Sequence, residues 1–216
     1  MKRQLLFGAI ISILGIVPLQ AQEFGVYTGV QVVRGELTEY SFTPASITSI
    51  NAFWDIAEAP HWRYGGEIRY ASMSLTPSID NGWLQEYRAE GNDFSVMMSM
   101  RYYYNTPANF YKRRRSFLIW SHFGVGFHAM NYQSTAYGAK GFGSSNKTQL
   151  SETRSAQAGA LEFGSGMQYY FDDHWSITLV GGVQYTGNDY LDGVSGIGDG
   201  EDWPVYAMLG GSYRLF

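Results

Sequence analysis

The stretch SFLIWSHFGVGFHAM, residues 116–130, alternates large apolar side chains with small or polar ones. One face carries five apolar side chains: Phe117, Ile119, Phe123, Val125 and Phe127. The other face carries His122, Gly124, Gly126 and His128. Because successive side chains of a strand point to opposite faces, this period of two predicts a β-strand with one apolar face.

Seven further segments show the same alternation, so the sequence predicts eight strands in all. They occupy residues 24–33, 49–57, 62–75, 93–105, 160–171, 175–187 and 205–216. Apart from the slightly short second segment of the chain, each reaches the roughly 9–11 residues that a tilted membrane strand requires. An even number of strands is typical of bacterial membrane barrels.

The predicted connections between these strands alternate in length. The short ones are residues 57–61, 106–113 and 172–174, and the long ones are residues 35–48, 76–92, 131–159 and 188–202. Membrane barrels have short periplasmic turns and longer outer loops, so this asymmetry predicts an up-and-down barrel. The longest connection is rich in Gly, Ser, Thr and Gln, and we expect it to be a mobile loop.

Glycine on the less apolar face favours a membrane barrel over a soluble barrel or sandwich. The glycines of this face are Gly25, Gly29, Gly65, Gly124, Gly126, Gly164, Gly166, Gly182 and Gly210. On a solvated face they would weaken the strands, whereas in a narrow lumen they leave room for large neighbours. The predicted fold class is therefore all-β, an eight-stranded antiparallel up-and-down transmembrane β-barrel.

Charged side chains on the same face are nearly balanced in sign. The acidic ones are Asp55, Glu67 and Glu162, and the basic ones are Arg69, Arg101 and Arg214. Buried charges need partners, because their desolvation is costly. We expect these six residues to form a structural charge network in the lumen.

Aromatic side chains on the apolar face gather near the predicted strand ends. Those near the short turns are Trp54, Tyr64, Tyr102, Tyr104, Tyr169, Phe171 and Tyr213, and those near the long loops are Phe94 and Tyr185. Aromatic girdles at both interfaces are typical of membrane barrels.

Residues 1–21 read as a secretory signal. Lys2 and Arg3 precede the apolar stretch 5–17, and Ala21 offers a small residue for cleavage. The apolar stretch is shorter than the ~20 residues of a membrane-spanning helix. Removal of the signal leaves 13 of the 15 basic residues and all 19 acidic ones in the barrel domain, residues 22–216, a net charge of −6 that argues against nucleic-acid binding.

The chain resembles the small outer-membrane barrels, both the OmpA- and OmpX-like proteins and the PorT-like barrels of Bacteroidota. The resemblance is carried by AIISILGIVPLQAQ (9–22), the eight alternating segments and the ending GGSYRLF (210–216). It implies an outer-membrane location in a Gram-negative, Bacteroidota-like bacterium. It also implies that Tyr213, Leu215 and Phe216 signal to the barrel-assembly machinery, although the aromatic before Phe216 lies three places away rather than the usual two.

Two histidines of the lumen face raise the possibility of catalysis. Some eight-stranded barrels modify lipid A with His-Ser-acid groups, and Glu162 on the neighbouring segment is placed to approach His128. Ser121, however, lies on the opposite face from His122, and no serine is fixed beside such a pair. We therefore expect lumen histidines with structural partners and no enzyme activity.

Two charged segments lie in predicted connections. The run Lys112, Arg113, Arg114 and Arg115 occupies a short turn, where it is either solvated or in contact with anionic headgroups or an acidic periplasmic partner. The acidic loop 187–203 does not match the spacing of a calcium loop. The absence of cysteine excludes disulfides and Cys-ligated metals, and we expect no cofactor.

The sequence thus predicts a non-enzymatic outer-membrane barrel with a side-chain-filled lumen and a structural or interaction role in the cell envelope. Its expected partners are outer-membrane lipids including lipopolysaccharide, the assembly machinery during insertion and an envelope protein. The resemblance to the PorT-like barrels implies an accessory role in secretion or envelope assembly. The alternatives are a lipid A-modifying barrel enzyme and a small channel.

Overall fold

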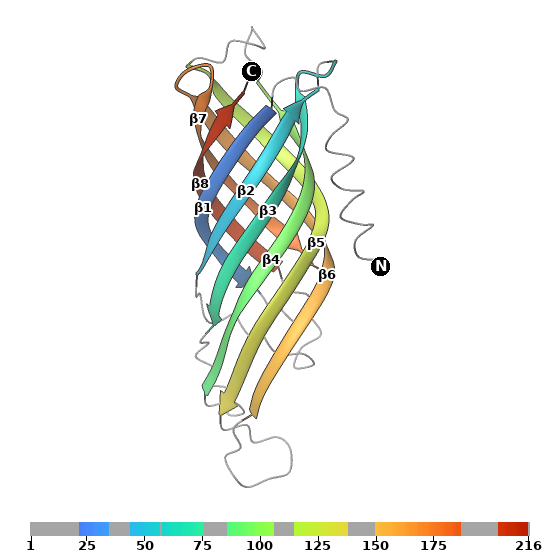
Figure 1. Cartoon of the computed structure of the whole chain (residues 1–216), viewed down its shortest axis with the longest axis vertical. Helices are drawn as coiled ribbons and strands as arrows, with labels where there is room; N and C mark the ends of the chain where they lie inside the picture. Colours follow the sequence, from blue (N-terminus) through green and yellow to red (C-terminus); the bar gives the residue numbers. More distant parts are fainter. Residues whose placement is uncertain are drawn as a thin grey trace.

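The computed structural model describes residues 22–34, 44–56, 58–75, 86–105, 115–137, 150–186 and 203–215. Its strands are β1 (Gln22–Arg34), β2 (Ala45–Asp55), β3 (Trp62–Leu75), β4 (Glu86–Tyr103), β5 (Phe117–Tyr137), β6 (Leu150–Tyr170), β7 (Trp175–Tyr185) and β8 (Trp203–Arg214). They form a closed antiparallel barrel in chain order (Figure 1). The predicted eight-stranded fold is confirmed. In the part of the chain that the structure describes, no helix has the length and apolar character needed to span a bilayer.

The last strand closes the barrel by pairing with the first. The register runs from Glu23 opposite Arg214 to Arg34 opposite Trp203. Figure 1 shows β1 and β8 side by side, with the C-terminus at the end of the barrel where the short turns lie. We call this end the short-turn rim; it includes residues 58–61 and 171–174.

Besides β2, which begins at Ala45 instead of residue 49, three strands extend much farther than the sequence predicts. β4 begins at Glu86, β5 continues to Tyr137 and β6 begins at Leu150, so the prediction of a loop over residues 76–92 and of one over 131–159 was wrong where these strands continue. The added residues no longer alternate between apolar and polar, but their backbones stay paired, from Asn131 opposite Ser155 to Ala136 opposite Leu150. The three strands project past the others at the end opposite the short-turn rim (Figure 1).

Alternation along each strand separates an apolar exterior from the lumen. On β1, Val26 is 58% exposed and the next residue, Tyr27, is 1% exposed. On β5, Phe127 is 73% exposed and His128 is 1% exposed. The predicted faces are confirmed, because large apolar or aromatic side chains are exposed on all eight strands.

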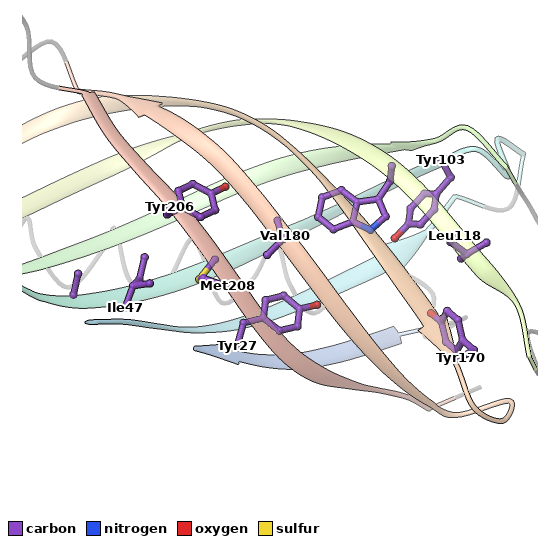
Figure 2. Packing of buried hydrophobic residues seen from close by; sticks show 10 residues of the cluster. Tyr27, Ile47, Tyr103, Leu118, Tyr170, Val180, Tyr206 and Met208 are labelled. Carbon is purple, nitrogen blue, oxygen red and sulfur yellow. The ribbon is translucent and has the colours of Figure 1, made fainter. Parts of the chain in front are cut away.

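Large side chains share the lumen with glycine. A Cβ on Gly166 would collide with the Trp120 ring, and a Cβ on Gly65 would collide with the Phe53 ring. Figure 2 shows the buried rings spaced along the barrel, with Tyr103 and Tyr170 at one end and Tyr206 at the other. Glycine on one strand therefore makes room for a ring on its neighbour.

Aromatic rings pair on the outer surface at both ends of the barrel. At the short-turn rim, Trp54 stacks on Tyr64 with ring centroids 5.7 Å apart, and Tyr169 meets Phe171 at 5.5 Å. At the other end, Tyr185 packs on Trp203 at 5.0 Å. The predicted girdles are thus present on both rims.

Several predicted features lie outside the described residues. They are the signal peptide (1–21), most of the basic turn (Lys112, Arg113 and Arg114), the acidic residues 187–202 and Phe216.

We predict that Gly210→Val destabilises the barrel and that Gly211→Val does not. A Cβ on Gly210 would collide with the Tyr27 ring and the Val26 carbonyl oxygen, whereas one on the outward-facing Gly211 has only the Ser176 carbonyl oxygen nearby, at 3.9 Å. Overpacking of this kind costs about 1–3 kcal/mol or more. Urea unfolding of the refolded barrel in detergent measures both changes, and equal stability of the two variants would contradict the proposed packing.

Candidate functional site: the filled lumen

A cluster of four charged side chains lies in the lumen near the short-turn rim. Arg63 of β3 contacts Glu23 of β1 at 2.9 Å through Nη1, and its Nε contacts Asp55 of β2. Arg214 of β8 reaches the other oxygen of Asp55 at 3.1 Å. The four side chains are almost fully buried, so the cluster joins four strands across the seam where the barrel closes.

Polar side chains complete the coordination of this cluster. Gln168 Nε2 donates to Glu23 Oε1 at 2.7 Å, and the Tyr170 hydroxyl donates to the other oxygen of Glu23. Arg63 also donates to the Tyr103 hydroxyl at 3.1 Å. Because β6 lies across the lumen from β1, the bonds to Glu23 fill the barrel from wall to wall.

A second cluster occupies the middle of the lumen around Arg69. Its guanidinium contacts Glu67 at 2.5 Å and binds both oxygens of Glu162, at 2.5 and 2.7 Å. Two parallel bonds between a guanidinium and a carboxylate give both strength and orientation. All three side chains are buried, so each charge depends on the others for compensation.

His122 and Tyr206 add the remaining contacts to Glu162. His122 Nε2 lies 2.5 Å from Glu162 Oε1, and the Tyr206 hydroxyl donates to the same oxygen at 2.8 Å. Since a carboxylate only accepts, the histidine carries its hydrogen on Nε2. Arg69 also lies 4.2 Å from the centre of the Tyr206 ring. Glu162 is thereby the shared acceptor of residues from β3, β5 and β8.

Arg101 is buried between rings instead of beside a carboxylate. Its guanidinium carbon lies 3.4 Å from the centre of the Phe53 ring and 4.1 Å from that of Trp120. Arg63 is its direct neighbour across β3 and β4. Two like charges in such positions repel, which accounts for Arg63 turning to the acidic cluster and Arg101 to the rings. Of the residues that the structure describes, none forms the expected ion pair with Arg101.

His128 lies closer to the outer end of the lumen, beside Asp93. Nδ1 of His128 is 3.1 Å from Asp93 Oδ1, and Gln31 donates to the other oxygen at 3.2 Å. The expectation that Glu162 approaches His128 was wrong. The strand register places Glu162 opposite Gly124 and Ala158 opposite His128, so Glu162 meets His122 instead.

Sequence reasoning missed three charged residues of the lumen: Glu23, Arg63 and Asp93. Each has the same parity as a lumen residue already recognised on its strand, for example Arg63 with Glu67 and Arg69 on β3. The alternation along each strand therefore indicated that these three residues face the lumen. It was overlooked because these residues lie at or beyond the ends of the clearest apolar pattern.

The remaining predicted residues lie at the short-turn rim. Tyr213 packs between His174 and Trp175 on the outer surface, at 5.6 and 4.8 Å between ring centroids. Leu215 is 39% exposed on the same face. Arg115 is exposed in the turn before β5 and has a positive φ of 58°.

The contacts of the described lumen side chains are ion pairs, hydrogen bonds and ring contacts. Ser121 lies on the outer surface, where its hydroxyl bonds the Tyr104 hydroxyl at 2.8 Å, so it does not reach His122. Among the described residues, no group of three His, Cys, Asp or Glu side chains is arranged to hold a metal ion.

Comparison with known proteins identifies the fold. Neither a family model nor a curated protein matches the sequence. The structure is similar to a major outer membrane protein from Thermus thermophilus, with a TM-score of 0.56, 16% identity and coverage of 90% of this chain and 99% of that one. It is also similar to Ail, the attachment invasion locus protein of Yersinia pestis, with a TM-score of 0.55, 13% identity and coverage of 90% and 98%. A third similar structure is that of Neisserial surface protein A, with a TM-score of 0.53, 11% identity and coverage of 89% of this chain and 97% of that one. The chain has the fold of the small eight-stranded outer-membrane barrels.

We predict that Glu162→Gln lowers the free energy of unfolding by about 3–5 kcal/mol, because it leaves Arg69 buried with part of its charge uncompensated. The double variant Arg69→Met with Glu162→Gln loses less than the sum of the two single changes, by about 1–3 kcal/mol. Glu58→Gln, on the exposed turn before β3, is the control and leaves the stability unchanged. Additive effects in this double-mutant cycle would contradict the coupling.

Proposed function

We propose that this protein is a non-enzymatic outer-membrane barrel of a Gram-negative envelope, with a closed lumen and a projecting sheet that binds a partner protein. The observation that carries the proposal is the contrast between the two parts of β4, β5 and β6. Their inner parts form the wall around the packed lumen. Beyond it, β6 stays paired with β5 to Leu150 after its pairing with β7 has ended at Leu161, and β4 stays paired with β5 to Glu86, past its last pair with β3 at Ala89. We further propose that residues 1–21 are removed on export.

The closed lumen follows from its bonds across the barrel. Arg69 on β3 binds Glu162 on β6, and Glu23 on β1 accepts from Gln168 and Tyr170 on β6. An eight-stranded barrel has space in its interior for little more than side chains. Hydrated ions would have to separate buried ion pairs in order to pass, which argues against the alternative of a channel.

Among the described residues, the β7-facing edge of β6 is unpaired in the projecting sheet. Pairing with β7 ends where Leu161 faces Tyr185, whereas pairing with β5 continues to Leu150. No residue that the structure describes pairs with β6 between these points on the β7 side. The N–H of Phe171 faces β7 and that of Tyr170 faces β5, so alternation directs the N–H of Ser155 and Gln157 toward the open edge.

An open edge of this kind is suited to strand addition by another chain. Edge strands present unpaired N–H and C=O groups to any extended segment, and such a segment can bind them without a preformed pocket. Thr153, Ser155 and Gln157 are exposed and polar, which agrees with a position outside the hydrocarbon core. The proposed partner is an envelope or surface protein, with secretion or envelope assembly as the process served.

The alternative of a lipid A-modifying enzyme is less well supported. His122 is engaged with Glu162, and His128 is 1% exposed inside the lumen, away from the lipid-facing surface. Lipid contact, including lipopolysaccharide, is instead proposed for the apolar exterior, and the assembly machinery for the C-terminal strand with Tyr213 and Leu215. A changed acyl-chain count in the mass spectrum of lipid A, on deletion of the gene, would favour the enzyme.

We predict that the purified barrel inserts into planar lipid bilayers without steady conductance. The reason is that the central and short-turn clusters block the lumen at two levels. Single-channel recording at several salt concentrations is the measurement, and co-flotation with vesicles shows that the protein has inserted. Stable openings of uniform size would refute the closed lumen.

We predict that Ser155→Pro abolishes partner binding and that Ser155→Ala preserves it. Proline removes the edge-facing N–H, whereas alanine keeps it, and neither change interrupts the pairing with β5. Copurification from native membranes in mild detergent compares the two variants with the unchanged chain. A partner that stays bound to the proline variant would exclude this edge as the binding surface.

A further inference from the structure

The dipeptide His-Trp occurs twice in the chain, each time at the end of a short turn. His61-Trp62 opens β3, and His174-Trp175 opens β7. In each case the tryptophan lies directly opposite a tyrosine of the next strand, Tyr102 on β4 or Tyr213 on β8. We call each group of three rings a His-Trp clamp.

The first clamp combines ring packing with two bonds to the backbone of β4. His61 stacks on Tyr102 at 5.7 Å and 23°, and Trp62 meets the same ring at 5.0 Å and 60°. His61 Nδ1 lies 2.7 Å from the carbonyl oxygen of Tyr103, and the Tyr103 N–H donates to the His61 carbonyl oxygen at 2.7 Å.

The second clamp repeats this geometry on β7 and β8. His174 stacks on Tyr213 at 5.6 Å and 21°, and Trp175 meets that ring at 4.8 Å and 62°. His174 Nδ1 lies 2.9 Å from the carbonyl oxygen of Arg214, whose N–H donates back to the His174 carbonyl oxygen at 2.9 Å. Two different turns thus form the same arrangement of three rings and two backbone bonds.

The bond to the backbone fixes the tautomer of each histidine. A carbonyl oxygen only accepts, so Nδ1 carries a hydrogen, and in the uncharged ring the lone pair is on Nε2. Both imidazoles lie at the surface, and none of the described contacts occupies Nε2 of either. Each clamp therefore offers one hydrogen-bond acceptor beside electron-rich rings.

The surroundings of both clamps favour a cation at the membrane interface. Glu58 is exposed in the turn before His61, and Asp172 and Asp173 directly precede His174. Trp62 and Trp175 are 40% and 55% exposed on the surface that continues into the apolar belt. Aromatic faces bind ammonium groups, and carboxylates strengthen that attraction.

We propose that each His-Trp clamp binds the protonated amine of a phosphatidylethanolamine headgroup in the leaflet at the short-turn rim. The amine donates a hydrogen bond to Nε2 of His61 or His174 and lies against the aromatic rings. The two sites lie on opposite walls, because β3–β4 and β7–β8 are four strands apart in a closed ring of eight (Figure 1). This inference rests on the proposed membrane location and adds a lipid class to it.

The test is lipid retention by the full barrel in vesicles that contain equal amounts of phosphatidylethanolamine, its N,N-dimethyl form, phosphatidylcholine and phosphatidylglycerol with identical acyl chains. Native mass spectrometry after gentle detergent release counts the lipids that stay bound. We expect two phosphatidylethanolamine molecules per barrel, enriched at least about fivefold over phosphatidylcholine. The dimethyl form, which keeps one N–H, is retained better than phosphatidylcholine, which has none.

Matched variants separate headgroup binding from rim structure. His61→Asn with His174→Asn retains a donor for the backbone carbonyls but removes Nε2, and His61→Phe with His174→Phe retains the stacked rings. Both double variants lose the enrichment, and each single variant loses one of the two lipids. Trp203→Phe, in the aromatic pair at the opposite rim that lacks histidine, leaves the enrichment unchanged.

The outcomes distinguish this inference from the membrane placement. Equal retention of phosphatidylcholine and phosphatidylethanolamine, or full enrichment in the asparagine variants, overturns the proposed amine sites while the barrel still floats with vesicles. Failure of the unchanged chain to float with vesicles overturns the membrane location and the inference together.

Discussion

The narrow interior of an eight-stranded barrel is the constraint on which the rest of this structure depends. Every second side chain points into a space that has to be filled without voids and without uncompensated charge. Glycine opposite a large ring, as at Gly166 beside Trp120, lets the interior be filled without voids. Arg69 between Glu67 and Glu162 compensates the buried charges. Because the lumen takes up the charged and polar side chains, the membrane-facing exterior can be apolar, and we place the proposed function at the rims and beyond them.

The two ends of the barrel differ in what they present. At the short-turn rim the connections are short and rich in aromatic residues, and the His61 and His174 side chains bond to the backbone of the neighbouring strands. At the opposite end, β4, β5 and β6 leave the barrel as a polar sheet, and no described residue pairs with the outer part of β6 on its β7 side. The first end is suited to fixing the barrel in its bilayer, and the second to meeting another protein. In the proposed function, the barrel between them supports both ends.

The strands and their faces could be predicted from the sequence, because a period of two is read locally and the lumen glycines distinguish a membrane barrel from a soluble one. The outer halves of β5 and β6 could not, since beyond the membrane polar side chains suit both faces and the alternation disappears while the pairing continues. Charged lumen residues could be placed on the correct face, but not with their partners. That Glu162 meets His122 and not His128 depends on strand register, which no local pattern encodes.

The short-turn cluster also has a consequence for assembly of the barrel. Asp55 on β2 is bound by Arg63 on β3, which arrives early in the chain, and by Arg214 on β8, which arrives last. Until β8 docks against β1, Asp55 lacks its contact with Arg214. This ion pair therefore stabilises the closed barrel relative to a form in which β8 has not yet paired with β1.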